Sequence, residues 1–193
     1  MKIGILALQG DFHEHQVCFN RLNVETQLVR SISDLNLCDA LVIPGGESTT
    51  ISKLLKISKL DSEIIIKVRN GMPLWGTCAG LILISNNVIE GEPHPLELID
   101  IKTSRNFYGR QVDSFVEKIY LINDNKVFEA IFIRAPKIME FGKNVDILAT
   151  TNDKTPVAVQ YNNILGTTFH PELTDDLRIH NHFIEMGKKN LIK

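Results

Sequence analysis

The fold is decided by residues 74–84, which read LWGTCAGLILI. A short apolar run enters the turn GTCAG at 76–80, and a second apolar run follows it. Small residues around Cys78 permit a sharp strand-to-helix turn that presents the central side chain at the helix N-terminus. We therefore expect a strand up to Gly76, then a tight turn, and a helix that begins at Leu81.

On both sides of this turn, apolar runs of strand length are separated by other elements. Asp11 is expected to cap a helix that follows it, residues 48–50 are expected to cap a second helix, and a last helix follows 174–176. Alternating strands and helices are typical of βαβ units and a parallel sheet, so we predict an α/β fold with a central, mainly parallel sheet covered by helices. Residues 90–95 are expected to form a surface loop between two halves of one sheet system. The expected strands are 3–8, 26–29, 40–43, 98–103, 114–121, 130–133, 145–150, 157–161 and 164–169.

The chain has 193 residues, a formal net charge of −2 and three cysteines. Its length fits one domain, which we take as residues 1–193. The absence of a block of Lys and Arg argues against nucleic acid as the main partner. No apolar run approaches the roughly 18 residues that a membrane span needs. An odd number of cysteines favours a reducing compartment over a disulfide framework, so we expect a cytoplasmic protein.

Cys78 is the candidate nucleophile. At a strand-to-helix turn the helix dipole favours the thiolate over the thiol. A thiolate needs a proton-transfer partner, and a candidate is His170, followed by Pro171 and Glu172. In an extended segment residues i and i+2 face the same way, so Glu172 is expected to lie beside His170 and to orient its imidazole. The structural alternatives are a buried cysteine in a glycine turn and a histidine of the core.

The segment 44–50, PGGESTT, forms a second glycine turn at a strand end. It lacks the Gly-Lys-Ser/Thr sequence of a phosphate loop. Backbone N–H groups at Gly46 and at Ala79 are instead suited to bind a developing oxyanion. An ordinary turn and helix cap is the simpler alternative.

Two His-x-His pairs, at 13–15 and 180–182, are weak candidates for a metal site. On a helix, side chains two residues apart point about 200° from each other, so the members of one pair do not chelate together. We expect no metal and no other cofactor.

Together these motifs resemble class I, or triad, glutamine amidotransferases. The resemblance is most specific to the PdxT family, the glutaminase subunit of pyridoxal 5′-phosphate synthase, and extends over nearly the whole chain. The motifs that carry it are LQG at 8–10, PGGESTT at 44–50, GTCAG at 76–80, RNFYGRQ at 105–111, IRAP at 133–136 and FHPELT at 169–174. The sequence departs from the usual family pattern at 107–108 and at 95–97.

The resemblance implies a three-layer, flavodoxin-like fold. It also implies that Cys78, His170 and Glu172 form the catalytic triad. A guanidinium suits the α-carboxylate of glutamine, and a carboxylate such as Glu47 suits its ammonium, whereas surface salt bridges are the alternative role for these groups. The glutamine-binding positions that the resemblance implies are Gly46, Glu47, Ser48, Arg105, Ile133 and Arg134.

The activity implied by the resemblance is hydrolysis of L-glutamine to L-glutamate and ammonia through a cysteine thioester. The ammonia would pass to a PdxS-type synthase subunit in a hetero-oligomer that makes pyridoxal 5′-phosphate. Docking of that subunit would organise the oxyanion loop, so we expect the isolated chain to be weakly active.

Three other functions stay open on the sequence. The chain could be the glutaminase subunit of another amidotransferase, such as imidazole glycerol phosphate synthase, although its motifs at 44–50 and 105–111 should then differ. A PfpI-type cysteine hydrolase or chaperone would share the Cys78 turn and lack the His170 motif. A non-catalytic scaffolding subunit would not require a complete triad.

Overall fold

The computed structural model describes residues 1–105, 114–121 and 127–191. The helices of these ranges are α1 (Phe12–Arg21), α2 (Ile32–Leu35), α3 (Ser48–Ser58), α4 (Leu60–Arg69), α5 (Ala79–Ile84), the 3₁₀ helix η1 (Pro171–Leu173) and α6 (Arg178–Leu191). The strands are β1 (Lys2–Leu6), β2 (Glu25–Val29), β3 (Ala40–Ile43), β4 (Leu74–Thr77), β5 (Ser85–Val88), β6 (Ile99–Ser104), β7 (Ser114–Leu121), β8 (Val127–Ile133), β9 (Lys137–Phe141), β10 (Asp146–Thr150), β11 (Pro156–Tyr161) and β12 (Ile164–Thr167).

Within these ranges the strands form a nine-stranded sheet, in the order β2-β1-β3-β4-β12-β11-β10-β7-β8, and a three-stranded sheet, β5-β6-β9. Neighbouring strands from β2 to β12 run parallel, and those from β12 to β8 run antiparallel. The predicted α/β fold with a parallel centre is confirmed. The antiparallel extension is an addition that the strand pattern of the C-terminal part did not specify.

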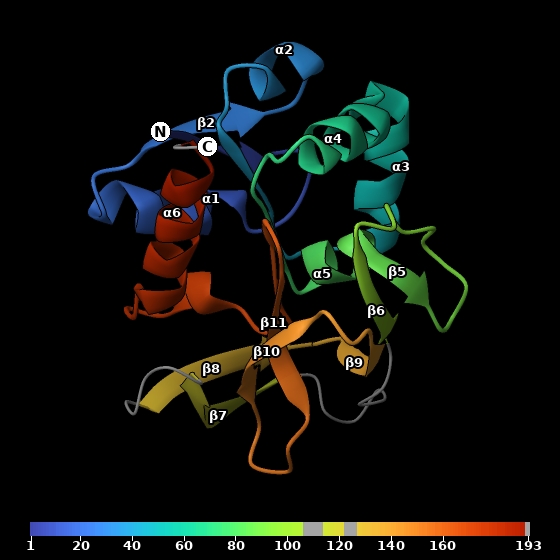
Figure 1. Cartoon of the computed structure of the whole chain (residues 1–193), viewed down its shortest axis with the longest axis vertical. Coiled ribbons are helices and arrows are strands. Elements are labelled where there is room, and N and C mark those ends of the chain that lie inside the picture. Colours follow the sequence, from blue (N-terminus) through green and yellow to red (C-terminus); the bar gives the residue numbers. More distant parts are fainter. Residues whose placement is uncertain (106–113, 122–126, 192–193) are drawn as a thin grey trace.

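The parallel strands are covered on both faces, and β3 shows why. All four of its residues are buried, because successive side chains point to opposite faces of the sheet. Leu41 and Ile43 pack into one core with α3, α4 and α5, whereas Ala40 and Val42 pack into a second core with α1 and α6. Figure 1 shows these two helical layers on either side of the sheet.

The small sheet was not foreseen. Its strand β5 reads SNNV, and β9 is exposed over three of its five residues, so neither has the apolar pattern of a buried strand. Residues 90–95 connect β5 and β6, which are neighbouring strands of this small sheet. The expectation that they connect the two halves of a single sheet system is therefore wrong, because the structure has two separate sheets within the described residues. The helix after Cys78 begins at Ala79, two residues before the predicted start.

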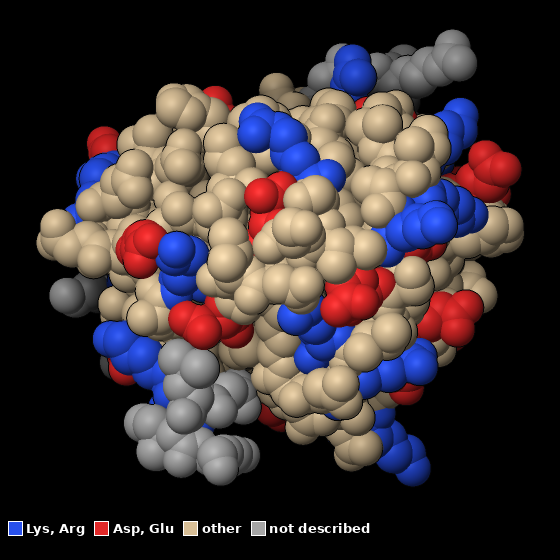
Figure 2. All heavy atoms as spheres, turned by 90° about the horizontal axis from the view of Figure 1, so that it is seen from above, with Lys and Arg blue, Asp and Glu red and all other residues tan. Residues whose placement is uncertain are grey.

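The surface carries charge of both signs. On the face seen in Figure 2, basic and acidic side chains are interspersed. Among the helices that the structure describes, none combines the length and the apolar character that a membrane crossing requires.

The sheet order brings the candidate motifs together. Strands β3, β4 and β12 are neighbours and run parallel, so the segments after their carboxyl ends lie at one edge of the sheet. These segments begin at Pro44, Cys78 and Thr168. Ligands of open parallel sheets bind at such an edge.

Candidate active site

Cys78 occupies the turn between β4 and α5 with φ 47° and ψ −102°. A positive φ is unusual for a residue with a side chain, and such strain concentrates at functional sites. The turn closes because Gly80 lies against β3, where an added Cβ would meet the backbone of Ile43. Cys78 is 6% exposed, and its Sγ lies 3.7 Å from the carbonyl oxygen of Ile133. The predicted strand, turn and helix are therefore confirmed.

His170 and Glu172 lie next to each other, as predicted, with Nδ1 of the imidazole 2.7 Å from Oε1 of the carboxylate. The expected extended geometry is wrong, because Pro171 begins the 3₁₀ helix η1 and the segment turns. A proline is well suited to the first position of a helix, since its fixed φ is helical and its missing N–H needs no partner there. The turn, and not strand alternation, sets the contact.

Burial is the largest single influence on the pKa of each member of this pair. It raises the pKa of Glu172, an effect that the hydrogen bond from His170 opposes. Burial by itself lowers the pKa of His170, but the interactions with Cys78 and Glu172 outweigh it and raise the pKa to about 11. His170 is accordingly held as an imidazolium between a sulfur and a carboxylate.

The glycine turn after β3 is tied to the segment after β1. The N–H of Asp11 donates to the carbonyl of Gly45 at 3.1 Å, and the side chain of Gln9 accepts from the N–H of Glu47 at 2.8 Å. Gly46 has φ 151°, where a side chain would meet that same Gln9 amide. Asp11 was expected to cap α1, but its side chain makes no cap bond and lies 3.5 Å from Nδ1 of His170.

Glu47 caps α3, a role that we had given to residues 48–50. Its carboxylate accepts from the N–H groups of Thr49 and Thr50. Burial raises the pKa of Glu47, but these hydrogen bonds outweigh it and lower the pKa to about 2. Arg105 donates to the same carboxylate at 3.3 Å and to the carbonyl of Glu92 at 3.0 Å. The rest of its motif, including 107–108, lies outside the described residues.

A pocket of about 510 Å³ opens above Cys78. Every residue of the predicted triad and binding set lines it except Glu172, which lies behind His170. The lining residues are Gln9, Asp11, Gly46, Glu47, Ser48, Cys78, Ala79, Ile82, Arg105, Ile133, Arg134, His170 and Leu173. The structure thus brings together groups from six separate segments of the chain.

Some of these neighbours were missed by the sequence analysis. In the sequence, Gln9 stands out only as part of the LQG motif, and Asp11 only as a possible helix cap. The ligand-type atoms of Asp11, His170 and Glu172 lie within 4.8 Å of one another, but Nδ1 of the histidine is already hydrogen-bonded to a carboxylate. The two His-x-His pairs do contact each other, through His15 and His180, which lie 165 positions apart. The spacing within each motif keeps its own two histidines apart, and only the tertiary structure brings one histidine of each motif together.

The geometry can be compared with proteins already known. A solved structure described as a glutamine amidotransferase has a TM-score of 0.91 to this chain and is 39% identical, covering 96% of this chain and 98% of its own. Pyridoxal 5′-phosphate synthase subunit PdxT of Thermosipho africanus is 50% identical over 98% of this chain and 100% of its own length. The subunit of the same name from Thermotoga maritima is 48% identical, over 97% and 100%.

The fold and the cysteine pocket define the class of glutamine amidotransferases, and the predicted class is confirmed. Residues 5–189 match the sequence profile of one family within it, the SNO glutamine amidotransferase family. The chain belongs to this family.

Proposed function

We propose that this chain hydrolyses L-glutamine to L-glutamate and ammonia, and that it supplies the ammonia to a PdxS-type synthase subunit for pyridoxal 5′-phosphate biosynthesis. One observation carries the proposal: Cys78, on a strained turn, shares a pocket with His170, whose ring is hydrogen-bonded to buried Glu172. The relatives named as synthase subunits match this chain over almost its whole length, which supports the choice of partner.

In the first half-reaction, the thiolate of Cys78 attacks the side-chain amide carbon of glutamine, and a C–S bond forms. Backbone N–H groups of Ala79 and Gly46 stabilise the oxyanion. His170 donates its proton to the departing nitrogen, the C–N bond breaks, and ammonia leaves. Glu172 stays ionised and balances the charge of the imidazolium.

In the second half-reaction, His170 accepts a proton from water, which attacks the γ-glutamyl thioester. The C–S bond breaks, glutamate leaves, and the thiolate of Cys78 is restored. Both catalytic side chains return to their starting states and water is the co-substrate, so the steps described use no cofactor.

The amino-acid end of glutamine would be held at the rim of the pocket. Arg105 and Arg134 supply guanidinium groups for the α-carboxylate, and Glu47 supplies a carboxylate for the ammonium. Ser48 and Ile133 complete the predicted binding set. Because Glu47 already caps α3 and pairs with Arg105, its orientation is determined before glutamine arrives.

We place the protein in the cytoplasm. Its three cysteines are free thiols, as expected for a reducing compartment. A single domain over residues 1–193 stays a prediction.

The test is glutamate release from glutamine, measured with and without a PdxS-type synthase subunit. Cys78→Ala should lower the rate by at least about 1,000-fold, because it removes the nucleophile. Cys38→Ala is the matched control, since Cys38 lies outside the pocket. Release that the partner stimulates and that only Cys78→Ala abolishes is the expected result.

Other results would redirect the proposal. No release, although the complex forms, would assign a scaffolding role. Strong release without the partner would contradict the expectation that docking organises the oxyanion loop. Stimulation by a different synthase subunit would keep the glutaminase activity and change the pathway.

A further inference from the structure

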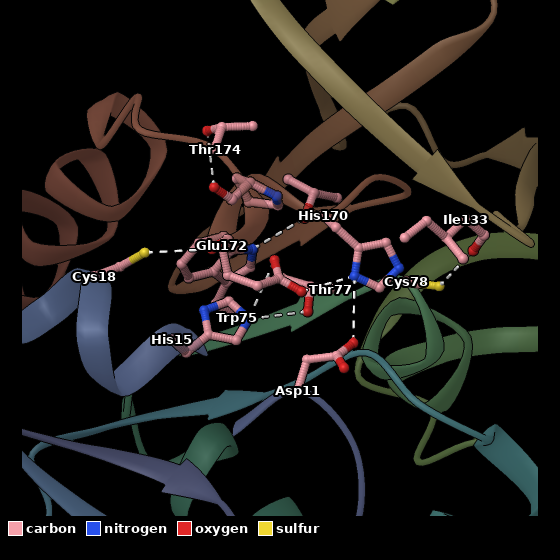
Figure 3. A network of polar contacts seen from close by, with 12 residues as sticks. Asp11, His15, Cys18, Trp75, Thr77, Cys78, Ile133, His170, Glu172 and Thr174 are labelled. Carbon is pink, nitrogen blue, oxygen red and sulfur yellow. Dashed lines mark hydrogen bonds and ion pairs between the residues drawn. The ribbon is translucent and has the colours of Figure 1, made fainter. Parts of the chain in front are cut away.

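Behind the proposed triad lies a second set of polar side chains that the mechanism above does not use. His15 of α1 and His180 of α6 are both fully buried, and their atoms Nδ1 and Nε2 are 3.2 Å apart. The other ring nitrogen of His15, Nε2, lies 3.2 Å from Oγ1 of Thr77 and 3.5 Å from Oε2 of Glu172. Figure 3 shows the contacts of this ring with Thr77 and with the carboxylate of Glu172 as dashed lines.

The carboxylate of Glu172 needs such a neighbour. Its side chain has no exposed surface. Oxygen Oε1 is hydrogen-bonded to His170, whereas Oε2 makes no hydrogen bond to any residue that the structure describes. Burying an ionised oxygen without a donor is costly, and Nε2 of His15, 3.5 Å away, is a polar atom that faces it.

The tautomers of the two histidines follow from the same contacts. Nδ1 of His180 is buried and makes no hydrogen bond to the described residues. A buried N–H without an acceptor is rarer than an unpaired acceptor, so the proton of His180 belongs on Nε2, from which it is donated to Nδ1 of His15. His15 then carries its own proton on Nε2, pointing toward Thr77 and Glu172. Burial, followed by the nearby His180 and His170, lowers the pKa of His15 well below 6.5, which is consistent with this neutral form.

We propose that His15 is a positioning residue of the glutaminase site: its Nε2–H lies 3.5 Å from Oε2 of Glu172 and attracts that oxygen, so that Oε1 stays directed at His170. The inference rests on the proposed function. Removing one of two anchors lets a carboxylate rotate away from its histidine, and residues that orient catalytic groups in this way contribute about 10- to 100-fold in metal sites of similar construction. His180 acts one step further back, because it sets the tautomer of His15.

The pH dependence follows from every ionisable group that faces Glu172. Without the N–H of His15, the carboxylate is less stabilised and takes up a proton at higher pH. The acid limb of kcat/KM therefore moves to higher pH. The facing groups are His170 and Cys78 at the site, His15 and Cys18 on α1, and Asp11 before it, with His180 of α6 behind His15.

The experiment uses the full chain with its synthase partner and compares three variants. His15→Leu removes the donor and should lower kcat about tenfold, leave KM within about twofold and move the acid limb up by about one pH unit. His15→Gln keeps an N–H near the position of Nε2 and should recover most of the loss. Phe183→Leu is the control. Phe183 packs against Trp75 in the same core, but it contributes no polar group to the contacts among His180, His15 and Glu172.

A merely structural role for His15 predicts a different pattern. Phe183→Leu would then shift the profile as His15→Leu does, or His15→Gln would fail to restore it, and either result overturns the proposal. An acid limb at the same pH in His15→Leu and in the wild type also overturns it.

A second measurement needs no turnover and covers the case in which His15→Leu does not fold. Nitrogen-15 NMR of labelled histidines in the wild-type protein should show both His15 and His180 neutral and protonated on Nε2. A proton on Nδ1 of His15 overturns the proposal. If the wild type shows these tautomers but releases no glutamate with its partner, the proposed function fails. The positioning proposal is then tested by the pKa of His170, which should be lower in His15→Leu than in His15→Gln, and it falls if the two values are equal.

Discussion

In the parallel part of the large sheet, strands β3, β4 and β12 are buried at every position, whereas in β7 and β8 of the antiparallel part exposed residues alternate with buried or half-buried ones. Helices cover both faces of the first part. Large apolar side chains remain exposed on the second, among them Val116, Tyr120 and Val127. The two parts share one hydrogen-bonded sheet but differ in how far their side chains are buried.

The residues of the active site are divided between these two parts of the sheet. Cys78 and His170 follow strands of the parallel part, where close packing allows only small errors in position. The antiparallel part contributes Ile133, whose carbonyl meets the thiol, and the neighbouring Arg134. The reacting groups thus stand on the buried strands, and strand β8 closes the pocket from the other side.

The largest expected effect comes from filling a tight backbone contact of the parallel part. Gly80→Ala would drive a Cβ into the backbone of Ile43, which cannot rotate away, so we expect a loss of about 4 kcal/mol or more in the free energy of unfolding. In Gly142→Ala the new Cβ meets the carboxylate of Asp100, a side-chain end that can move, and the loss should stay below about 1 kcal/mol. Urea unfolding of both variants checks the contrast, and similar losses would contradict it.

The next effect compares one apolar residue from each part. Leu41→Ala leaves a cavity in a fully buried strand and should cost about 3 kcal/mol. Val116→Ala, at a position that is 62% exposed, should change the stability by less than about 0.5 kcal/mol. Thermal unfolding followed by circular dichroism measures both, and a large effect of Val116→Ala would show that the antiparallel part is covered in solution.

A third effect depends on pH. Burial lowers the pKa of His180 from 6.5 to about 3 in the folded protein. Between these values the unfolded chain binds the proton and the folded chain does not, so the stability present above pH 6.5 is lost as the pH falls. The free energy of unfolding is plotted against pH for the wild type and for His180→Phe. Between pH 6 and 4, the slope of this plot should be smaller in His180→Phe by up to about 1.4 kcal/mol per pH unit.

The control for this slope is Phe183→Leu, which removes no ionisable group. Its curve should lie lower than that of the wild type at every pH and run parallel to it. A slope in His180→Phe equal to that of the wild type would mean that His180 is protonated in the fold.

The smallest expected effect is at the rim of the pocket. Arg105→Lys keeps the charge but loses the fork that can bind a carboxylate with two hydrogen bonds, so KM for glutamine should rise about fivefold, or ~1 kcal/mol. The stability should not change measurably. Arg21→Lys, in an exposed pair with Asp175, is the matched control and should leave KM as it is; an equal rise in both variants would remove Arg105 from the binding set.

Much of the parallel part could be read from the sequence because each of its segments carries a local signal. The run at 40–43 is apolar at every position, and β3 has these bounds. The glycines around Cys78 required a tight turn, and the turn is there. By contrast, β5 and β9 have no apolar periodicity, since their pairing in a small sheet leaves much of their surface exposed.

For the active site, too, some features could be predicted from the sequence and others could not. The sequence alone determined the class of chemistry, because a cysteine in a glycine turn and a His-Pro-Glu segment are local patterns with local geometry. Only the tertiary structure decided that Gln9 holds the glycine turn, that Asp11 faces His170, and that His15 and His180 meet behind Glu172. These contacts join residues far apart in the chain, and their distances follow from the order of strands in the sheet, which no short stretch of sequence encodes.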